Sequence, residues 1–170
     1  MIRYLGFVLV TAGSAAIGIL MAAGIKRQEQ LYRQALFMLS YMQGEIEFHL
    51  STLDKISLDL SQKLPMPLSA VFSSMNRRIL QSPGISVGQQ MRYSLEDCGH
   101  LLPMELQDEL RALFSHLGHQ DVSAQIRAIE ESRGRLGLLR QQLFADRKER
   151  CRAYRTIGLC AGFALAILLI

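Results

Sequence analysis

The residues best suited to chemistry in this sequence are two histidines followed closely by an aspartate. His116, His119 and Asp121 could contribute to a metal site, because imidazole nitrogens and carboxylate oxygens are common zinc ligands. Metal-binding helices place such histidines at i and i+4, whereas these are spaced i, i+3 and Gly118 interrupts the helix between them. We interpret them as a solvated helix end, where histidine interacts favourably with the helix dipole.

Other signatures of catalysis are absent from the sequence. Cys98, Cys151 and Cys160 are odd in number and lack CxxC spacing, so they predict neither a disulfide framework nor a zinc site. There is no GxSxG elbow and no GxxxxGK[ST] phosphate loop. Glu45 and Glu47 lie two residues apart and face different directions on a helix, which makes a poor acid–base pair. We therefore expect no catalytic, cofactor-binding or metal site.

Charged residues are the remaining candidates, as a surface for a protein partner. Asp108, Glu109 and Arg111 lie close together in the sequence, and Arg77 and Arg78 form a second charged pair. We interpret all five as ordinary exposed residues of amphipathic helices, with a partner-binding surface as the alternative. The function must then depend on what the protein holds and where it is held.

The excess of positive charge flanks the hydrophobic ends of the chain. From residue 28 to residue 152 the acidic and basic residues are equal in number, so the net charge of +4 comes from Arg3, Lys26, Arg27 and Arg155. A nucleic-acid-binding protein concentrates positive charge on its folded domain. Charge beside apolar segments instead indicates membrane topology, so we expect no nucleic-acid partner.

Residues 4–25 are uncharged and long enough, at ~1.5 Å per residue, to cross a hydrocarbon core of ~30 Å. Their many Gly and Ala residues permit close packing on a neighbouring membrane helix. A cleaved signal peptide is the alternative, but Lys26 and Arg27 follow the apolar run at once and resist translocation. We predict an uncleaved transmembrane helix at residues 1–25.

Residues 157–170 form a second apolar run, which spans roughly 27 Å when it is extended back to residue 153. We predict a C-terminal transmembrane helix at residues 153–170, with a buried helix of the soluble core as the alternative. Because both apolar runs are basic on the side that faces the middle of the chain, the middle is expected in the cytoplasm. Both termini are then expected on the opposite side of the membrane.

Apolar residues between the two runs recur every three or four positions, which predicts helices almost throughout. No segment alternates with a period of two, so we expect no sheet. The predicted apolar stripes are Ala35, Leu39, Met42, Ile46 and Leu50; Leu53, Ile56, Leu60 and Leu64; Leu68, Val71, Met75 and Ile79; Val87, Met91, Leu95 and Cys98; Leu106, Leu110, Leu113 and Leu117; and Val122, Ile126, Ile129, Leu136, Leu139 and Leu143.

Capping signals mark the helix boundaries. Ser51, Ser86 and Asp121 are predicted N-caps, and Pro67 and Pro103 are predicted first-turn residues. The connections are short, which makes sequential helices antiparallel neighbours. We therefore predict an all-α protein: an antiparallel helical bundle at residues 28–150, flanked by N- and C-terminal transmembrane helices.

The last predicted helix has no clear stop signal after Asp121, so it can continue as one rod into the C-terminal run. Arg133 stands where an apolar residue would continue its stripe. This arginine indicates either a break in the helix or a partner contact.

Three motifs give the sequence a family resemblance. They are GEIEF at residues 44–48 leading into LSTL at 50–53, LGHQD at 117–121 with Gln125, and YRTIGL at 154–159. With the two terminal apolar runs and the chain length, they resemble the stage III sporulation protein AB family of endospore-forming bacteria. The resemblance covers essentially the whole chain.

The resemblance implies a subunit of the channel complex between mother cell and forespore, in the mother-cell membrane that faces the forespore. The family's soluble domain is similar to the cytoplasmic domain of the type II secretion F protein, and GISV at residues 84–87 leading into QQM at 89–91 looks like its G-x-S turn. This chain departs from that pattern because it has no Trp near Met91. The implied partners are the ATPase stage III sporulation protein AA, or one like it, and the other channel subunits.

Two alternatives remain open at this stage. One is a type II secretion or pilus F-like assembly factor outside sporulation, although those chains usually carry two such helical domains. The other is a membrane-bound metal or redox protein that uses His116, His119 and Cys98.

Overall fold

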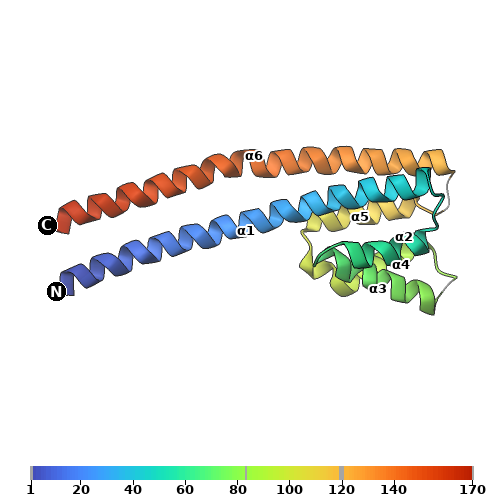
Figure 1. Cartoon of the computed structure of the whole chain (residues 1–170), viewed down its shortest axis with the longest axis horizontal. Helices are drawn as coiled ribbons and strands as arrows, with labels where there is room; N and C mark the ends of the chain where they lie inside the picture. Colours follow the sequence, from blue (N-terminus) through green and yellow to red (C-terminus); the bar gives the residue numbers. More distant parts are fainter. Residues whose placement is uncertain (1, 83, 119–120, 170) are drawn as a thin grey trace. The chain divides into compact units, whose positions relative to one another are not determined.

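The computed structural model describes the backbone of residues 2–82, 84–118 and 121–169, and the side chains of residues 24, 26–82, 84–118 and 121–145. All of its secondary structure is helical, and no strand occurs in these residues, which confirms the predicted all-α class (Figure 1). The elements are α1 (Ile2–Glu47), α2 (Leu53–Lys63), α3 (Leu68–Gln81), α4 (Val87–Cys98), the short 3-10 helix η1 (Gly99–Leu101), α5 (Met104–His116) and α6 (Val122–Leu169).

The chain divides into two compact units. One comprises the chain up to Gln30 and from Arg140 onwards, and the other comprises residues 31–139. Within the first unit, a guanidinium nitrogen of Arg140 lies 3.3 Å from a carboxylate oxygen of Glu29, which joins α6 to α1. Both long helices run without interruption through residues 25–28 and 150–153, where the sequence suggested domain boundaries. The last helix is thus assigned as a single element, Val122–Leu169.

The two predicted transmembrane helices fall in the first unit. Apart from Gly24, the side chains of residues 1–25 and 153–170 lie outside the described residues. Among the helices that the structure describes with their side chains, none combines the length and the apolar character that crossing a membrane requires. The two anchors stay predictions.

Most residues of the predicted stripes are buried in the core of the 31–139 unit, together with Tyr32, Phe72 and Phe114, which those stripes did not include. The 3.6-residue period brings these side chains to one face of each helix, where they are removed from water. Tyr32, Phe72 and Phe114 are among the largest buried side chains, and the rings of Phe72 and Phe114 meet at a centroid distance of 6.1 Å. Burying one such side chain contributes roughly 1.5–3 kcal/mol, so the stripes are the main source of stability.

The first predicted stripe ends one turn earlier than expected. Ile46 is buried, but Leu50 is 72% exposed and has a φ of 48°. Because α1 ends at Glu47, Leu50 lies in a turn with left-handed backbone, and its inclusion in the stripe was wrong.

The last stripe also differs from its prediction. Ser132 is fully buried in the gap between Ile129 and Leu136, and its hydroxyl accepts a hydrogen bond from Arg135 at 3.2 Å. Arg133 does not break the helix. A guanidinium N–H of Arg133 donates to the side-chain oxygen of Gln43 on α1 at 3.0 Å, so its role is a contact within this chain.

The capping predictions are confirmed at two of three serine or aspartate positions. The Ser86 hydroxyl accepts from the Gln89 N–H at 3.4 Å, and the Asp121 carbonyl accepts the first N–H bonds of α6. The prediction for Ser51 was wrong: Thr52 occupies the N-cap of α2, and the Ser51 hydroxyl instead donates to the Glu45 carboxylate at 2.7 Å.

The two prolines lie one residue before their predicted positions. Pro67 and Pro103 are N-cap residues, and α3 and α5 begin at Leu68 and Met104. A proline just before a helix still marks its start, because its missing N–H has no partner to lose there.

Candidate partner-binding surface

Two of the three residues considered for metal or redox chemistry, His116 and Cys98, lie at the ends of different helices. His116 is the exposed last residue of α5, Cys98 is half-buried at the end of α4, and His119 lies outside the described residues. Where the chain is described, no three His, Cys, Asp or Glu side chains are grouped so that they could hold a metal ion. Asp121 acts at the start of α6, where the Ser123 hydroxyl donates to its carboxylate and lowers its pKa.

The charged residues on α5 are tied into the bundle. Asp108 pairs with Arg111 at 2.7 Å on the same helix. Glu109, with only 16% of its side chain exposed, pairs with Arg135 of α6 at 2.8 Å. Glu109 therefore joins two helices and is not a free partner surface.

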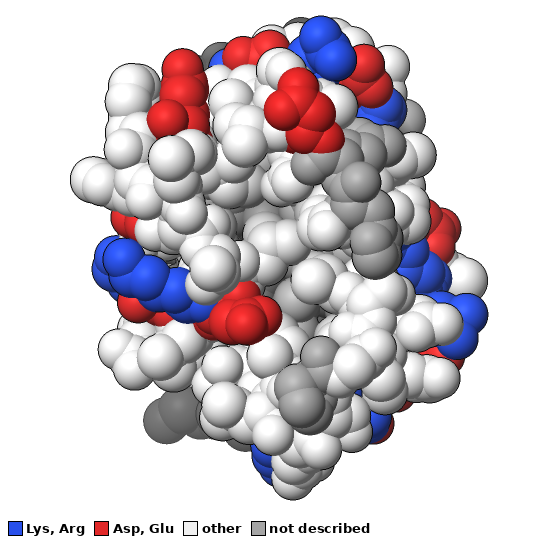
Figure 2. Space-filling view, turned by 90° about the vertical axis from the view of Figure 1, so that its right-hand side faces the viewer, with Lys and Arg blue, Asp and Glu red and all other residues white. Residues whose placement is uncertain are grey.

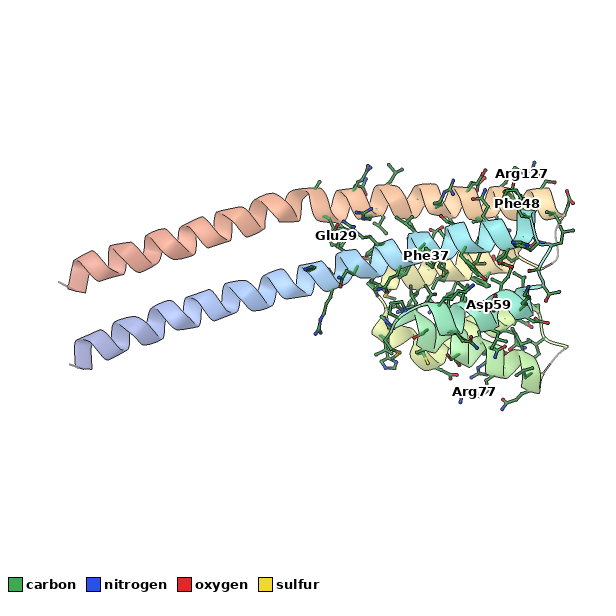
Figure 3. The ribbon with its side chains drawn as sticks, viewed as in Figure 1. Glu29, Phe37, Phe48, Asp59, Arg77 and Arg127 are labelled. Carbon is green, nitrogen blue, oxygen red and sulfur yellow. The ribbon has the colours of Figure 1, made fainter. Side chains whose placement is uncertain are left out.

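The charged residues on α3 form a separate set. Arg78 pairs with Asp97 of α4 at 2.6 Å, and the Ser74 hydroxyl donates to the same carboxylate oxygen at 3.0 Å. These two hydrogen bonds lower the pKa of Asp97. Arg77 is exposed on α3 (Figure 3). Asp97 could not be predicted as the partner of Arg78, because nothing in the sequence indicates that α4 places it opposite that arginine.

A polar network on α1 and α2 was also missed. The Tyr41 hydroxyl donates to Asp59 at 2.8 Å and accepts from Lys63 at 2.7 Å, and the Lys63 ammonium lies 4.1 Å from the ring centroid. The Lys63 hydrogen bond lowers the pKa of Tyr41, but burial and the carboxylates of Asp59 and Glu45 outweigh it, so the pKa lies above its usual value. The rings of Phe37 and Tyr41 stack on α1, but the available signal for the polar contacts was the i, i+4 spacing of Asp59 and Lys63.

The feature with the clearest capacity to bind a partner is one end of the bundle. The connections that follow α1, α3 and α5 all lie at this end of the 31–139 unit (Figure 1). We call it the loop end and define it as residues 45–55 and 84–87 with Leu117, Gly118, Asp121 and Val122.

Gly118 lies close to the first residues of α2 and α4. A Cβ atom on Gly118 would lie 3.4 Å from a methyl group of Val87 and 3.6 Å from one of Leu53, at the starts of α4 and α2. Gly118 has a φ of 89°, a conformation that other residues rarely adopt. The described residues of the loop end therefore include neighbours that are far apart in the sequence.

Large apolar side chains are exposed on this surface. Phe48 and Leu50 are 76% and 72% exposed, and Ile85 and Val122 are 38% and 39% exposed. Val122 was predicted to lie in an apolar stripe, and its exposure corrects that prediction. Figure 2, which looks onto the loop end, shows that uncharged side chains make up most of this face. Exposed apolar side chains that gather in one place indicate an interaction site.

The charges of the loop end are mostly negative. It carries the carboxylates of Glu45, Glu47, Asp54 and Asp121, and among its described residues Lys55 is the one lysine or arginine. The pKa of Glu45 lies below its usual value, chiefly because Ser51 donates to it, so it is ionised at neutral pH. Arg127, labelled in Figure 3, lies on the second turn of α6, close to the loop end, and its charge contributes to the lowered pKa of Asp121.

The turn that resembles the secretion F protein forms part of the loop end. Gly84 and Ile85 are exposed, while Ser86 caps α4. The Gln90 side-chain amide donates to the Ser82 carbonyl at 3.0 Å, and Met91 is fully buried. Met91 therefore fills the core at the place where the resemblance implies a neighbouring aromatic residue.

Comparisons with known proteins agree on one family. A family model described as stage III sporulation protein AB matches residues 3–170. A solved structure described as stage III sporulation protein AB superposes with a TM-score of 0.65 at 19% sequence identity, covering 72% of this chain and 98% of that chain. At that identity the likeness shows the fold alone. A search of curated sequences found no match.

The family model covers almost all of the sequence, and this confirms the resemblance that the motifs predicted. The chain belongs to the stage III sporulation protein AB family.

Proposed function

We propose that this protein is a non-enzymatic membrane platform of the channel complex between mother cell and forespore, and that it docks the cytoplasmic ATPase of that complex. Its family gives it a role in sporulation. The observation that carries the docking proposal is the loop end, where Phe48, Leu50, Ile85 and Val122 are exposed together. A folded domain rarely leaves such a group of side chains in water unless a partner covers it.

The predicted anchors supply the membrane part of the proposal. Helices α1 and α6 lead from the 31–139 unit into residues 1–25 and 153–170. With both segments in the mother-cell membrane that faces the forespore, the bundle lies in the cytoplasm, and other channel subunits are its neighbours in the membrane. Tethering raises the local concentration of binding sites at the membrane, so each docking contact can be weak.

The family supports sporulation over the alternative of a secretion or pilus factor in other cells. The proposed ATPase is stage III sporulation protein AA or one like it, which the resemblance implies. No contact among the described residues favours a metal or redox protein over the platform.

Co-purification tests the proposal. The full chain, extracted with mild detergent from sporulating cells and captured through an affinity tag, is expected to bring the ATPase with it. An unrelated tagged protein with two transmembrane helices controls for adhesion through detergent. If the ATPase is absent from every preparation of the folded chain, while it is present in the lysate, the docking role is wrong.

A further inference from the structure

We propose that the loop end is the surface on which the ATPase docks, and that it recognises a basic face of that partner which carries an apolar pocket. This inference rests on the proposed function and adds the location and the chemistry of the contact. It follows from three properties of the loop end: its apolar centre, its negative charge and its fixed shape.

The apolar part of the contact centres on Phe48 and Leu50. These two side chains are the most exposed apolar groups of the loop end, and they belong to the connection between α1 and α2. An aromatic side chain that enters a partner's pocket is typical of the residues that dominate the binding energy at protein interfaces. Phe48 is therefore expected to contribute the largest single share.

The charge of the contact follows from its carboxylates. Glu45, Glu47, Asp54 and Asp121 outnumber Lys55 by four to one at the loop end. The 28–152 region as a whole is neutral, so this end concentrates negative charge that the rest of the bundle balances. A partner surface rich in Lys and Arg would complement it, which raises the association rate and excludes acidic partners.

The loop end has a fixed shape before it meets a partner. A Cβ atom on Gly118 would lie 3.4 Å from Val87 and 3.6 Å from Leu53, so these three residues are close neighbours, and the Ser51 hydroxyl donates to the Glu45 carboxylate. The backbone N–H of Ser51 also donates to the Glu45 carbonyl at 3.0 Å. A surface that is already ordered loses less conformational entropy when it binds.

Other exposed groups are less suitable. Tyr41 and Lys63 bind each other and Asp59, and Arg78 is paired with Asp97. A partner that used these groups would first have to break contacts within the bundle. The exposed apolar side chains of the loop end can contact a partner without breaking such contacts.

The test measures the affinity of the purified full chain, in detergent or nanodiscs, for the purified ATPase. The apolar variant is Phe48→Ser with Leu50→Asn, because Asn tolerates the positive φ at that position. Its matched control is Met66→Ser with Met104→Ser, which removes two similarly exposed apolar side chains outside the loop end. We expect the apolar variant to weaken binding at least tenfold and the control to change it less than twofold.

A charge variant tests the second property without removing apolar surface. Glu47→Lys with Asp54→Asn should weaken binding several-fold at low salt. Because fewer opposite charges then meet across the interface, the affinity of this variant should also depend less on the salt concentration. Glu96→Lys, on the exposed face of α4, is its control. Circular dichroism melting establishes that each variant is folded.

Each outcome separates this inference from the proposed function. If the two loop-end variants lose binding and the controls do not change, the docking surface and the proposed function are both supported. Binding that stays within twofold of the wild type in either folded loop-end variant overturns the docking surface and leaves the platform intact. A wild-type chain that does not bind the ATPase at all overturns the proposed function, and this inference with it.

Discussion

The Glu109 carboxylate of α5 accepts a hydrogen bond from the Nε–H of Arg135 on α6 at 2.9 Å, and Nη2 of the same guanidinium forms an ion pair with that carboxylate oxygen at 2.8 Å. Glu109 is largely shielded from water, whereas Arg135 is half exposed. The pair therefore joins the last short helix of the bundle to the long helix that leads towards the C-terminus. It links α6 to α5 within the 31–139 unit.

Removing one partner of this pair is expected to destabilise the bundle. Glu109→Gln should lower the free energy of unfolding by about 1 kcal/mol, because the charge-assisted bonds are lost in a partly buried place. The exposed Asp108→Asn, which breaks the pair with Arg111, should cost less than about 0.5 kcal/mol. Denaturant unfolding measures both, and equal effects would contradict the assigned role of Glu109.

Replacing either of two glycines with alanine is expected to change the stability of the protein, in opposite directions. Gly118→Ala should destabilise the protein by about 1 kcal/mol or more, because the residue has a φ of 89°, a conformation that alanine rarely adopts. Gly134→Ala should stabilise it by about 0.5–1 kcal/mol, because Gly134 lies within α6 and nothing surrounds its Cβ position within 4 Å. Thermal melting of the two variants decides this. A stabilising Gly118→Ala would show that the loop end is packed differently.

Low pH is expected to weaken the contacts that Asp97 of α4 makes with Arg78 and Ser74 of α3. The pKa of Asp97 is lowered in the folded protein by the bonds from Arg78 and Ser74, so the unfolded chain binds a proton more readily than the folded chain does. The stabilisation is present above the unfolded pKa, near 3.9, and is lost as the pH falls through the folded pKa. Asp97→Asn should therefore be less stable than the wild type at pH 7, and the difference should shrink below pH 4. A difference that does not depend on pH would contradict this.

The fold could be predicted from the sequence where local patterns decide it. The period of Ala35, Leu39, Met42 and Ile46 identifies the buried face of α1, because a helix repeats its environment every 3.6 residues. The same pattern failed at Leu50, where the chain leaves the helix and the apolar spacing continues by coincidence. It failed again at Ser132, a polar residue that can be buried because Arg135 donates to its hydroxyl.

The candidate surface could not be predicted in the same way. Phe48, Ile85 and Val122 belong to three connections far apart in the sequence, and nothing local indicates that they share one end. Their common location follows from the antiparallel order of the helices and from the close approach at Gly118. Among the candidates drawn from the sequence, Asp121 lies on this surface, while Glu109 and Arg78 form ion pairs between helices of the bundle.

The topology of the bundle in the membrane tests the central claim most directly. A chain without native cysteines, carrying Leu80→Cys on the exposed face of α3, is expressed in a host whose membranes are prepared as inside-out and right-side-out vesicles. With an impermeant maleimide, we predict labelling of residue 80 in inside-out vesicles and none in intact right-side-out vesicles. A tag added after the C-terminus should be accessible in the opposite preparation. Labelling of residue 80 in right-side-out vesicles, or recovery of the chain in the fraction without membranes, would contradict a platform that faces the cytoplasm.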